Sequence, residues 1–417
     1  GQTGWPGKYI PGNIVYFNFF LFTVAQVIIA AFLSADFLNR ERKMDTTEVF
    51  YTRPMSNFQY VTGKTLGALQ VFLGLNLAVL LLSLVISLIS ADVVFVLQPF
   101  LVYLFLYSLP SLVFILGFSF ILMVLVRNQA VTFVLILGFA GIVLFYLKNM
   151  HHGVWDFIGF YLPVHYSGLS GFSNISAILF QRSTFFLLGV LGIFLTAYFL
   201  PRLPGHKRRS PMLLLISVGL LCGASFLIFH QISSGKSGRN IRDEIRMHEA
   251  TLPQIPSAHI KTCHLEVRHS EETITCEATL QLKIDSTSPL LLNLNPGFAI
   301  ETVTVNQQPA EFTFRHGLLS IEAHFEKASD TLVQCRLKYH GAPDQQTIYP
   351  YVKETDRQLL NRLTPLVAGK EHAFVQSNFL LLTRESGWYP VVAWQNFRQQ
   401  PAFTSYTLAF HSQNKTL

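Results

Sequence analysis

The sequence predicts a polytopic α-helical membrane domain followed by an all-β, antiparallel domain outside the cytoplasm. Half of the 417 residues are hydrophobic and only 13% are charged, whereas soluble domains carry about 25% charged residues. Six segments reach the roughly 20 apolar residues that a helix needs to cross a bilayer. After residue 257 the hydrophobic pattern changes from a helical period to a period of two, which is typical of half-buried strands.

The six predicted spans lie in the first 229 residues and contain no internal charge. They cover residues 13–34, 66–90, 99–126, 130–147, 183–200 and 211–229. Pro110 lies inside the unusually long third span and predicts a kink there, because proline lacks a backbone donor. The polar side chains that we noted within the spans are the amides Asn18, Gln26, Gln70 and Asn76, with no acid among them. A transporter driven by protons usually carries ionisable groups at the midplane, so this composition argues against proton coupling.

The positions of Lys and Arg predict the orientation, since short cytoplasmic loops are enriched in them. If residues 35–65, the turn at 127 and the loop 201–210 are cytoplasmic, they hold ten such residues: Arg40, Arg42, Lys43, Arg53, Lys64, Arg127, Arg202, Lys207, Arg208 and Arg209. The short segments on the other side hold only Lys8, Lys148 and Arg182. The tail after Phe229 then lies outside, and its 18 Lys and Arg balance 18 Asp and Glu, so the net charge of +7 belongs to the membrane half. This charge is a topology signal that favours anionic lipid and gives no reason to expect nucleic acid.

A polar stretch, TTEVFYTRPMSNFQYVTGK at 46–64, separates the first two spans. Asp45 and Glu48 fit a capping box that starts a helix, and Pro54 ends that helix after about two turns. Ser56 and Gln59 fit a second capping box, which starts the helix that enters the second span. The residues alone leave two interpretations open. The short helix rests on lipid headgroups, or it docks a cytoplasmic partner.

The outer domain begins after a predicted linker at 230–257, which mixes Gly and Ser with a short charged helix and a closing pair of prolines. Six apolar residues then alternate with polar ones and predict a half-buried strand: Ile274, Cys276, Ala278, Leu280, Leu282 and Ile284. Further strands are predicted at LLLNLN, IETVTVN, AEFTFRH, LLSIEAHF and TLVQCRLKYHG, separated by turn residues.

Two cysteines of the outer domain invite opposite interpretations. A turn at His269 and Ser270 would place Cys263 opposite Cys276 on one hairpin, close enough for a disulfide in an oxidising compartment. Alternatively, both are small buried hydrophobic residues.

Two short motifs resemble catalytic or nucleotide-binding signatures without completing them. GKT at 63–65 has Phe58 where a P-loop needs its first glycine, so ATP must be bound by a separate polypeptide. HEATL at 248–252 has Leu252 where the HExxH zinc motif needs its second histidine, and we expect plain helix there. We therefore assign no catalytic, metal or cofactor residue to this chain.

The run DFLNRERKMDTTEVFYTRPMSNFQYVTGK resembles the segment after the second span in permease subunits of type-2 ABC exporters. In that family an ERK cluster leads to a Thr-Glu pair, a turn and a Gly-Lys that enters the next span. The resemblance implies that residues 36–64 couple the membrane domain to a cytoplasmic ATPase subunit. The coupling residues matched by position are Glu41, Arg42, Lys43, Thr47, Glu48, Pro54 and Lys64.

The same resemblance implies a permease domain at 1–210 and an additional helix at 211–229. Since the family has six spans before any addition, we expect one further span before Gly1. The family's plan also implies a homodimer or heterodimer of permeases with two ATPase subunits, which hold the ATP.

Residues 258–417 are similar to the N-terminal β domain of the gluzincin aminopeptidases, the family of alanyl aminopeptidase N. The likeness rests on LKYHG, on ESGWYP at 385–390 and on AFTSYTLAF after it. In that family the zinc site lies in the next domain, so we expect a fragment of a longer protein in which zinc would bind beyond Leu417. Whether the full-length protein is a zinc metallo-aminopeptidase stays open.

Together these patterns predict a permease subunit of an ATP-driven exporter in a bacterial cytoplasmic membrane, with its β domain in the periplasm. Two alternatives remain. The chain is a membrane-anchored zinc aminopeptidase whose catalytic domain follows Leu417, or a membrane-anchored binding module without transport.

Overall fold

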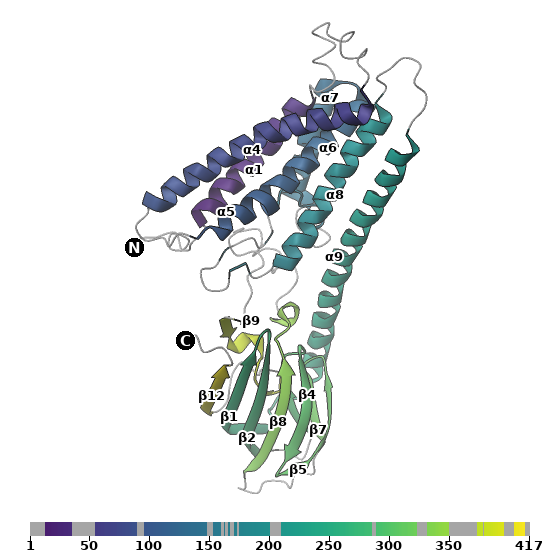
Figure 1. The fold of residues 1–417 in the computed structure, drawn as a ribbon. Helices are drawn as coiled ribbons and strands as arrows, with labels where there is room; N and C mark the ends of the chain where they lie inside the picture. Colours follow the sequence, from purple (N-terminus) through teal and green to yellow (C-terminus); the bar gives the residue numbers. More distant parts are fainter. Residues whose placement is uncertain are drawn as a thin grey trace. The chain divides into compact units, whose positions relative to one another are not determined.

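The computed structural model comprises two compact units, which are described separately (Figure 1). The first consists of residues 1–235 and 358–369, and the second of residues 236–357 and 370–417. The structure describes residues 13–35, 55–89, 96–147, 153–159, 162, 166, 171–172, 175–200, 210–285, 289–322, 332–349, 373–377, 379–395 and 404–412.

The first unit is helical. In chain order its segments are α1 (Asn13–Ala35), α4 (Asn57–Ile89), α5 (Gln98–Val102), the π-helical η1 (Tyr103–Ser108), α6 (Leu109–Val126), α7 (Gln129–Ile142), the π-helical η2 (Val143–Leu147), α8 (Ile175–Phe199) and α9 (Pro211–Thr251), which continues into the second unit. Six helical stretches in the described part are long and apolar enough to cross a membrane, so the six predicted apolar helices are confirmed. The helix that enters the second span begins at Asn57, directly after Ser56 of the predicted capping box. The helix of the fifth span begins earlier than predicted, at Ile175, which places Arg182 inside a helix.

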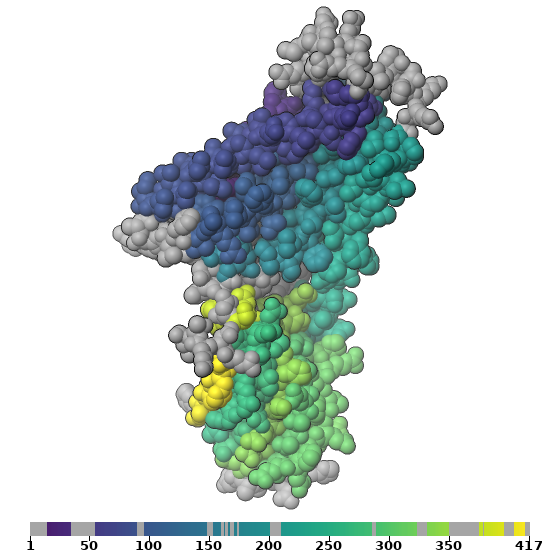
Figure 2. Space-filling model, viewed as in Figure 1, coloured from purple at the N-terminus to yellow at the C-terminus, as the bar shows by residue number. Residues whose placement is uncertain are grey.

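Helix α4 lies at the surface of the first unit, where it forms the blue-purple ridge in Figure 2. Its outward side chains are mostly apolar, and Leu66, Val71 and Ile89 are 59%, 60% and 77% exposed. A helix that is apolar on its exposed side as well as its buried side is typical of a membrane span.

The capping box at Ser56 and Gln59 determines where α4 begins. The Gln59 N–H donates to Ser56 Oγ at 3.2 Å, and the Ser56 N–H donates to Gln59 Oε1 at 2.9 Å. These reciprocal bonds satisfy donors that the first turn of a helix leaves without partners. The predicted second capping box is confirmed, whereas Asp45 and Glu48 lie outside the described residues.

Before Pro110, where a kink is predicted, the helix contains a π-helical segment. Proline cannot donate to the carbonyl four residues before it, and its ring clashes with that carbonyl. Segment η1 ends at Ser108, and the Leu109 N–H bonds to Leu104 O, five residues earlier. The wider turn accommodates the proline within one continuous helical run from Gln98 to Val126.

Three glycines bring the backbones of α6 and α8 into direct contact. A Cβ atom on Gly117 would overlap the carbonyl oxygen of Gly189, and one on Gly192 would lie 2.6 Å from the carbonyl carbon of Gly117. Small residues at such crossings let membrane helices gain van der Waals contact without a hydrophobic driving force.

The second unit is mostly β. Its strands are β1 (Ala258–Ser270), β2 (Thr273–Ile284), β3 (Leu290–Asn293), β4 (Phe298–Val305), β5 (Gln308–Pro309), β6 (Glu311–Arg315), β7 (Leu318–Glu322), β8 (Val333–Gly341), β9 (Ala373–Gln376), β10 (Phe379–Leu382), β11 (Val391–Val392) and β12 (Ser405–Ser412), with 3₁₀ turns η4 (Gln345–Thr347) and η5 (Arg384–Ser386).

The described strands form a six-stranded sheet in the order β12-β1-β2-β8-β4-β5, a four-stranded sheet in the order β11-β3-β7-β6, and the hairpin β9-β10. Both larger sheets bury one face in a shared core. The six alternating residues of β2 are all buried there, as predicted. The expectation of an entirely antiparallel domain is wrong at one edge, because β12 pairs with β1 in parallel. Parallel pairing requires a long connection rather than a hairpin, which local sequence patterns do not reveal.

The predicted linker at 230–257 is wrong for most of its length, because α9 is helical to Thr251. Contacts within the second unit hold its last turns. Arg242 Nη1 donates to Gln346 O at 2.7 Å, Glu244 Oε2 lies 2.8 Å from His316 Nε2, and Gln395 Nε2 donates to Ala250 O at 3.2 Å. These tertiary bonds outweigh the low helix propensity of the Gly and Ser residues.

The predicted pairing of Cys263 with Cys276 is also wrong. The hairpin turns at Glu271 and Glu272, two residues later than expected, so Cys263 faces Leu280 and Cys276 faces Val267. Both thiols are free and buried, as is Cys335 on β8. The alternative reading, small buried hydrophobic residues, is the one that the hairpin supports. Burial raises the pKa of each of the three thiols to about 12.

Replacing Gly189 with Ala should destabilise the helical unit, because the added Cβ meets the Val113 backbone. Overpacking typically costs about 1–3 kcal/mol. We expect a lower apparent melting temperature for the detergent-purified protein. Gly138→Ala is the matched control, since nothing lies within 4 Å of its Cβ position. Equal melting temperatures for the two variants would contradict the close helix crossing.

The stability of the β domain should fall as pH rises from 9 towards 12. The thiol pKa rises from 9.0 in the unfolded chain to about 12 on folding, so the unfolded state loses protons first and is favoured in this range. Each thiol contributes a slope of about 1.4 kcal/mol per pH unit. The urea midpoint of the β-domain transition, followed by tryptophan fluorescence, should fall less steeply with pH in Cys335→Ala than in wild type. Cys222→Ala, which lies in the helical unit, should leave the slope of the β-domain transition unchanged.

Candidate functional site

A buried polar cluster joins three helical segments inside the first unit. Gln26 of α1, Asn76 of α4 and Ser108 of η1 are each at most 1% exposed. Asn76 Nδ2 donates to Gln26 Oε1 at 2.6 Å, and Ser108 Oγ donates to Asn76 Oδ1 at 2.6 Å. Gln26 Nε2 also donates to Ser108 Oγ at 3.3 Å. We call these three residues the amide cluster.

The amide cluster lies where the π-helical turn ends. Single π-helical turns within α-helices are frequently found at functional sites. Ser108 is the last residue of η1 and stands two positions before Pro110. A change in this turn would therefore move the hydroxyl that bonds Asn76.

Three of the four amides noted within the predicted spans are hydrogen-bonded to other side chains, and the fourth is exposed. Asn18 donates from Nδ2 to Ser83 Oγ at 2.8 Å, which adds a second polar link between α1 and α4. Gln26 and Asn76 meet in the amide cluster, whereas Gln70 is exposed on α4. The sequence pattern did not identify Ser108, although its place beside Pro110 in a predicted span was a usable signal.

Arg182 forms a second buried polar site in the same unit. It is 1% exposed, and its guanidinium makes four hydrogen bonds. Nε donates to Gln181 Oε1 at 2.8 Å, Nη1 donates to Ser111 Oγ at 3.0 Å and to Phe157 O at 3.1 Å, and Nη2 donates to Asp156 O at 2.8 Å. The side chain thus ties α8 to α6 and to the loop 153–159.

The loop is shaped to receive this guanidinium. Gly159 has a φ of +83°, and its ideal Cβ position lies 2.8 Å from Tyr107 Cε2 and 3.1 Å from Arg182 Cζ. Asp156 Oδ1 accepts the Gly159 N–H at 2.9 Å, which fixes the turn. The Tyr107 ring lies 6.0 Å from Arg182 Cζ, within cation–π range. Charged residues inside membrane helices are costly, and such an arrangement meets that cost with neutral acceptors.

The residues that the sequence assigned to coupling are mostly outside the described part of the chain. Glu41, Arg42, Lys43, Thr47, Glu48 and Pro54 lie there, so their positions are not described. Lys64 is on the second turn of α4, where its Nζ lies 5.7 Å from the centre of the Tyr60 ring.

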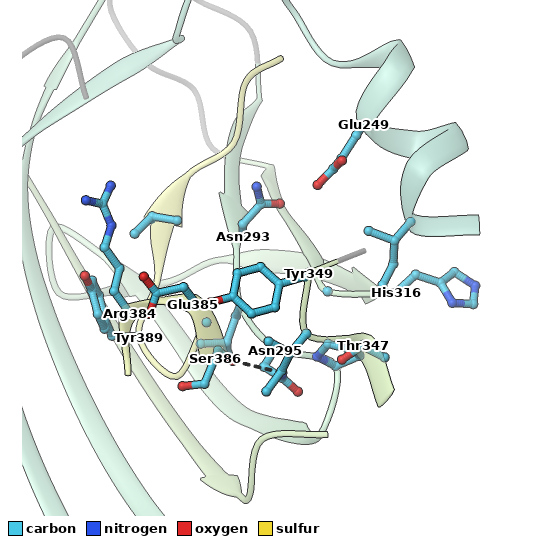
Figure 3. A pocket seen from close by; sticks show the side chains of 17 residues that line it. Glu249, Asn293, Asn295, His316, Thr347, Tyr349, Arg384, Glu385, Ser386 and Tyr389 are labelled. Carbon is cyan, nitrogen blue, oxygen red and sulfur yellow. Dashed lines mark hydrogen bonds between the residues drawn. The ribbon is translucent and has the colours of Figure 1, made fainter. Parts of the chain in front are cut away.

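The second unit contains a pocket of about 310 Å³, formed entirely by residues of that unit. Ile245 and Glu249 of α9 form one wall, and residues 384–387 of the η5 turn form the opposite wall (Figure 3). Residues 293–296 at the end of β3 and 347–349 at the end of η4 also line it.

Asn295 holds the pocket floor together. Its Nδ2 donates to Ser386 O at 2.9 Å, and its Oδ1 accepts the N–H groups of Gly297 and Asp344, both at 2.8 Å. The side chain therefore joins the segments that carry η4 and η5. Burial raises the pKa of Tyr389, on the rim, to about 12.

Within the described residues, no group of three or more His, Cys, Asp or Glu side chains could hold a metal ion. HEATL lies at the end of α9, as helix up to Thr251.

No family model and no curated protein matches the chain. The structural neighbours are M1 zinc metallopeptidases, each matched over part of the chain. A mutant enzyme from Deinococcus radiodurans bound to a Tyr-Ser-Ala substrate is 13% identical over 39% of this chain and 34% of that chain, with a TM-score of 0.28. Another structure of the M1 zinc metallopeptidase from Deinococcus radiodurans is 18% identical over 22% of each chain, with a TM-score of 0.20. Native yeast LTA4 hydrolase is 15% identical over 20% of this chain and 14% of that chain, with a TM-score of 0.17.

The chain thus spans no more than about a third of the length of these structures. TM-scores this low carry no argument about what the chain does.

Replacing Arg182 with Met should strongly destabilise the first unit. The change removes one charged donor from each of the carbonyls of Asp156 and Phe157, and a hydrogen bond to a charged group contributes about 1.5–3 kcal/mol. We expect a loss of about 3 kcal/mol, measured as a lower apparent melting temperature in detergent. Arg127→Met, at an exposed arginine, should change stability by no more than about 0.5 kcal/mol. If both variants melted like wild type, the guanidinium would not hold the loop.

Proposed function

We propose that the chain is the permease subunit of an ATP-driven ABC exporter, coupled to a separate cytoplasmic ATPase through residues 36–64. Its β domain would lie on the periplasmic side of a bacterial cytoplasmic membrane. One observation carries the proposal. The single helix α4 begins at the capping box beside the charged segment and bears Asn76 of the amide cluster further along.

This arrangement supports a mechanism for coupling. A helix transmits displacement along its axis because every backbone donor beyond the first turn is bonded internally. A push on residues 36–64 would therefore move Asn76 relative to Gln26 and Ser108. The three hydrogen bonds of the amide cluster would break or re-form together, and the neighbouring π-helical turn could take up the shift.

The cost of that switch is modest. Interhelical hydrogen bonds in membrane proteins contribute on average about 0.6 kcal/mol each, so an ATP-driven step has energy enough to exchange three of them. Arg182 and the glycine crossing would instead keep α6 and α8 as one rigid pair. The moving parts would be α1 and α4 against that pair.

Two copies of the chain, or this chain and a related permease, would pair with two ATPase subunits. ATP would bind only to those subunits, which fits the incomplete GKT motif at 63–65. The exposed apolar side chains of α4 suit contact with lipid.

A second candidate is a membrane-anchored binding module without transport, which the pocket of the β domain favours. Unlike a permease subunit, a binding module needs neither an ATPase partner nor a charged coupling segment.

Alanine replacement of Glu41, Arg42 and Glu48 should abolish co-purification with the ATPase subunit. Loss of three charges at a small interface removes its charge-assisted hydrogen bonds, each worth about 1.5–3 kcal/mol. The measurement is the amount of ATPase retained on the tagged chain after solubilisation. The matched control replaces Arg268, Glu272 and Glu322, which are exposed on the β domain and carry the same three charges.

If the triple alanine variant retained as much ATPase as the control variant, that result would contradict the coupling assignment. Absence of any ATPase from the wild-type preparation would favour the binding module.

A further inference from the structure

The pocket in the β domain carries charged side chains of both signs. Glu249 projects from α9 on one side, whereas Arg384 and Glu385 project from η5 on the other (Figure 3). Asn293 adds an amide, which can both donate and accept.

Several of these groups are available to a ligand. Arg384, Glu385 and the Asn293 side chain make no hydrogen bond or ion pair with any other residue that the structure describes. Glu249 already interacts with a neighbour, but a carboxylate keeps acceptor capacity beyond one bond. By contrast, hydrogen bonds within the floor of the pocket already occupy the polar groups of Asn295, Thr347 and Ser386.

Apolar groups line the pocket between the charged side chains. Ile245, Leu294, Ile348 and Val391 line the pocket, together with the rings of Tyr349 and Tyr389. A volume of about 310 Å³ is at the lower end for small-molecule sites. The pocket therefore suits a compact ligand with one apolar portion and charges of both signs.

We propose that this pocket binds a free amino acid with an apolar side chain, its ammonium group between Glu249 and Glu385 and its carboxylate on Arg384. A simple anion would meet two carboxylates and only one guanidinium. A simple amine would leave the exposed guanidinium of Arg384 without a partner. A zwitterion satisfies both signs. This inference goes beyond the proposed transport function and does not depend on it.

The test is calorimetric titration of L-leucine into the full-length chain in detergent. Two analogues separate the charges: 3-methylbutylamine lacks the carboxylate, and 4-methylpentanoate lacks the ammonium group. We expect L-leucine to bind with millimolar or lower Kd, and each analogue at least about tenfold more weakly.

Variants assign the charges to residues. Glu385→Gln and Arg384→Gln should each weaken L-leucine at least about tenfold. Glu322→Gln and Arg268→Gln remove the same charges from exposed positions on strands β7 and β1, and should leave the Kd unchanged. Suppose that Glu385→Gln weakened binding of the amine as much as binding of L-leucine, while Arg384→Gln left L-leucine binding unchanged. The ligand would then be a plain cation rather than a zwitterion, and the proposal would be overturned.

No heat of binding for L-leucine at 10 mM, on protein whose thermal transition is intact, would also overturn it. The ATPase co-purification experiment is independent of all these outcomes.

Discussion

The hydrogen bonds of Arg182 are the interaction on which the helical unit depends. A guanidinium is stable in apolar surroundings only if its donors are satisfied, and here they reach α6, the neighbouring Gln181 and the loop 153–159. The same bonds fix the distance between α6 and α8. At that distance only glycine fits at Gly117 and Gly189, so the crossing and the arginine constrain each other. The remaining helices pack around this pair with fewer fixed contacts, which is where motion is least costly.

The β domain is held together by a different set of interactions. Its two sheets bury a shared apolar core, and the segments at one end are held by hydrogen bonds as well as by packing against that core. Asn295 bonds segments up to 91 positions away in the chain, and Tyr339 donates from its hydroxyl to Trp388 O at 3.0 Å. These bonds form the rigid frame in which the charged rim of the pocket is displayed. Ligand pockets are typically pre-formed in this way, with a few polar side chains placed on a rigid floor.

Much of this architecture follows from local pattern. The six helices, the capping box at Ser56 and the buried face of β2 are each encoded within a few residues, where hydrophobic period and capping chemistry decide the outcome. The errors share a cause. The parallel partner of β1, the helicity of 230–251 and the burial of Arg182 depend on residues far away in the sequence, and a pattern read along the chain does not contain them. The register of the Cys263 hairpin failed for a smaller reason, since a two-residue shift in the turn moves both thiols past each other.

For the site the limit was similar. Gln26 and Asn76 were recognisable as polar residues in apolar spans, but their meeting with Ser108 requires the packing of three segments. The pocket draws on α9 and on loops between 293 and 391, and no short motif announces it.

The burial of three of the four cysteines has a practical consequence. Cys263, Cys276 and Cys335 are inaccessible in the β-domain core, which leaves Cys222 in the apolar stretch of α9 as the exposed thiol. Within this chain, the unmodified Cys222 is therefore already a single-site handle. A fluorophore or spin label attached there would report whether that stretch of α9 meets lipid or water, with no need to remove the other sulfur atoms.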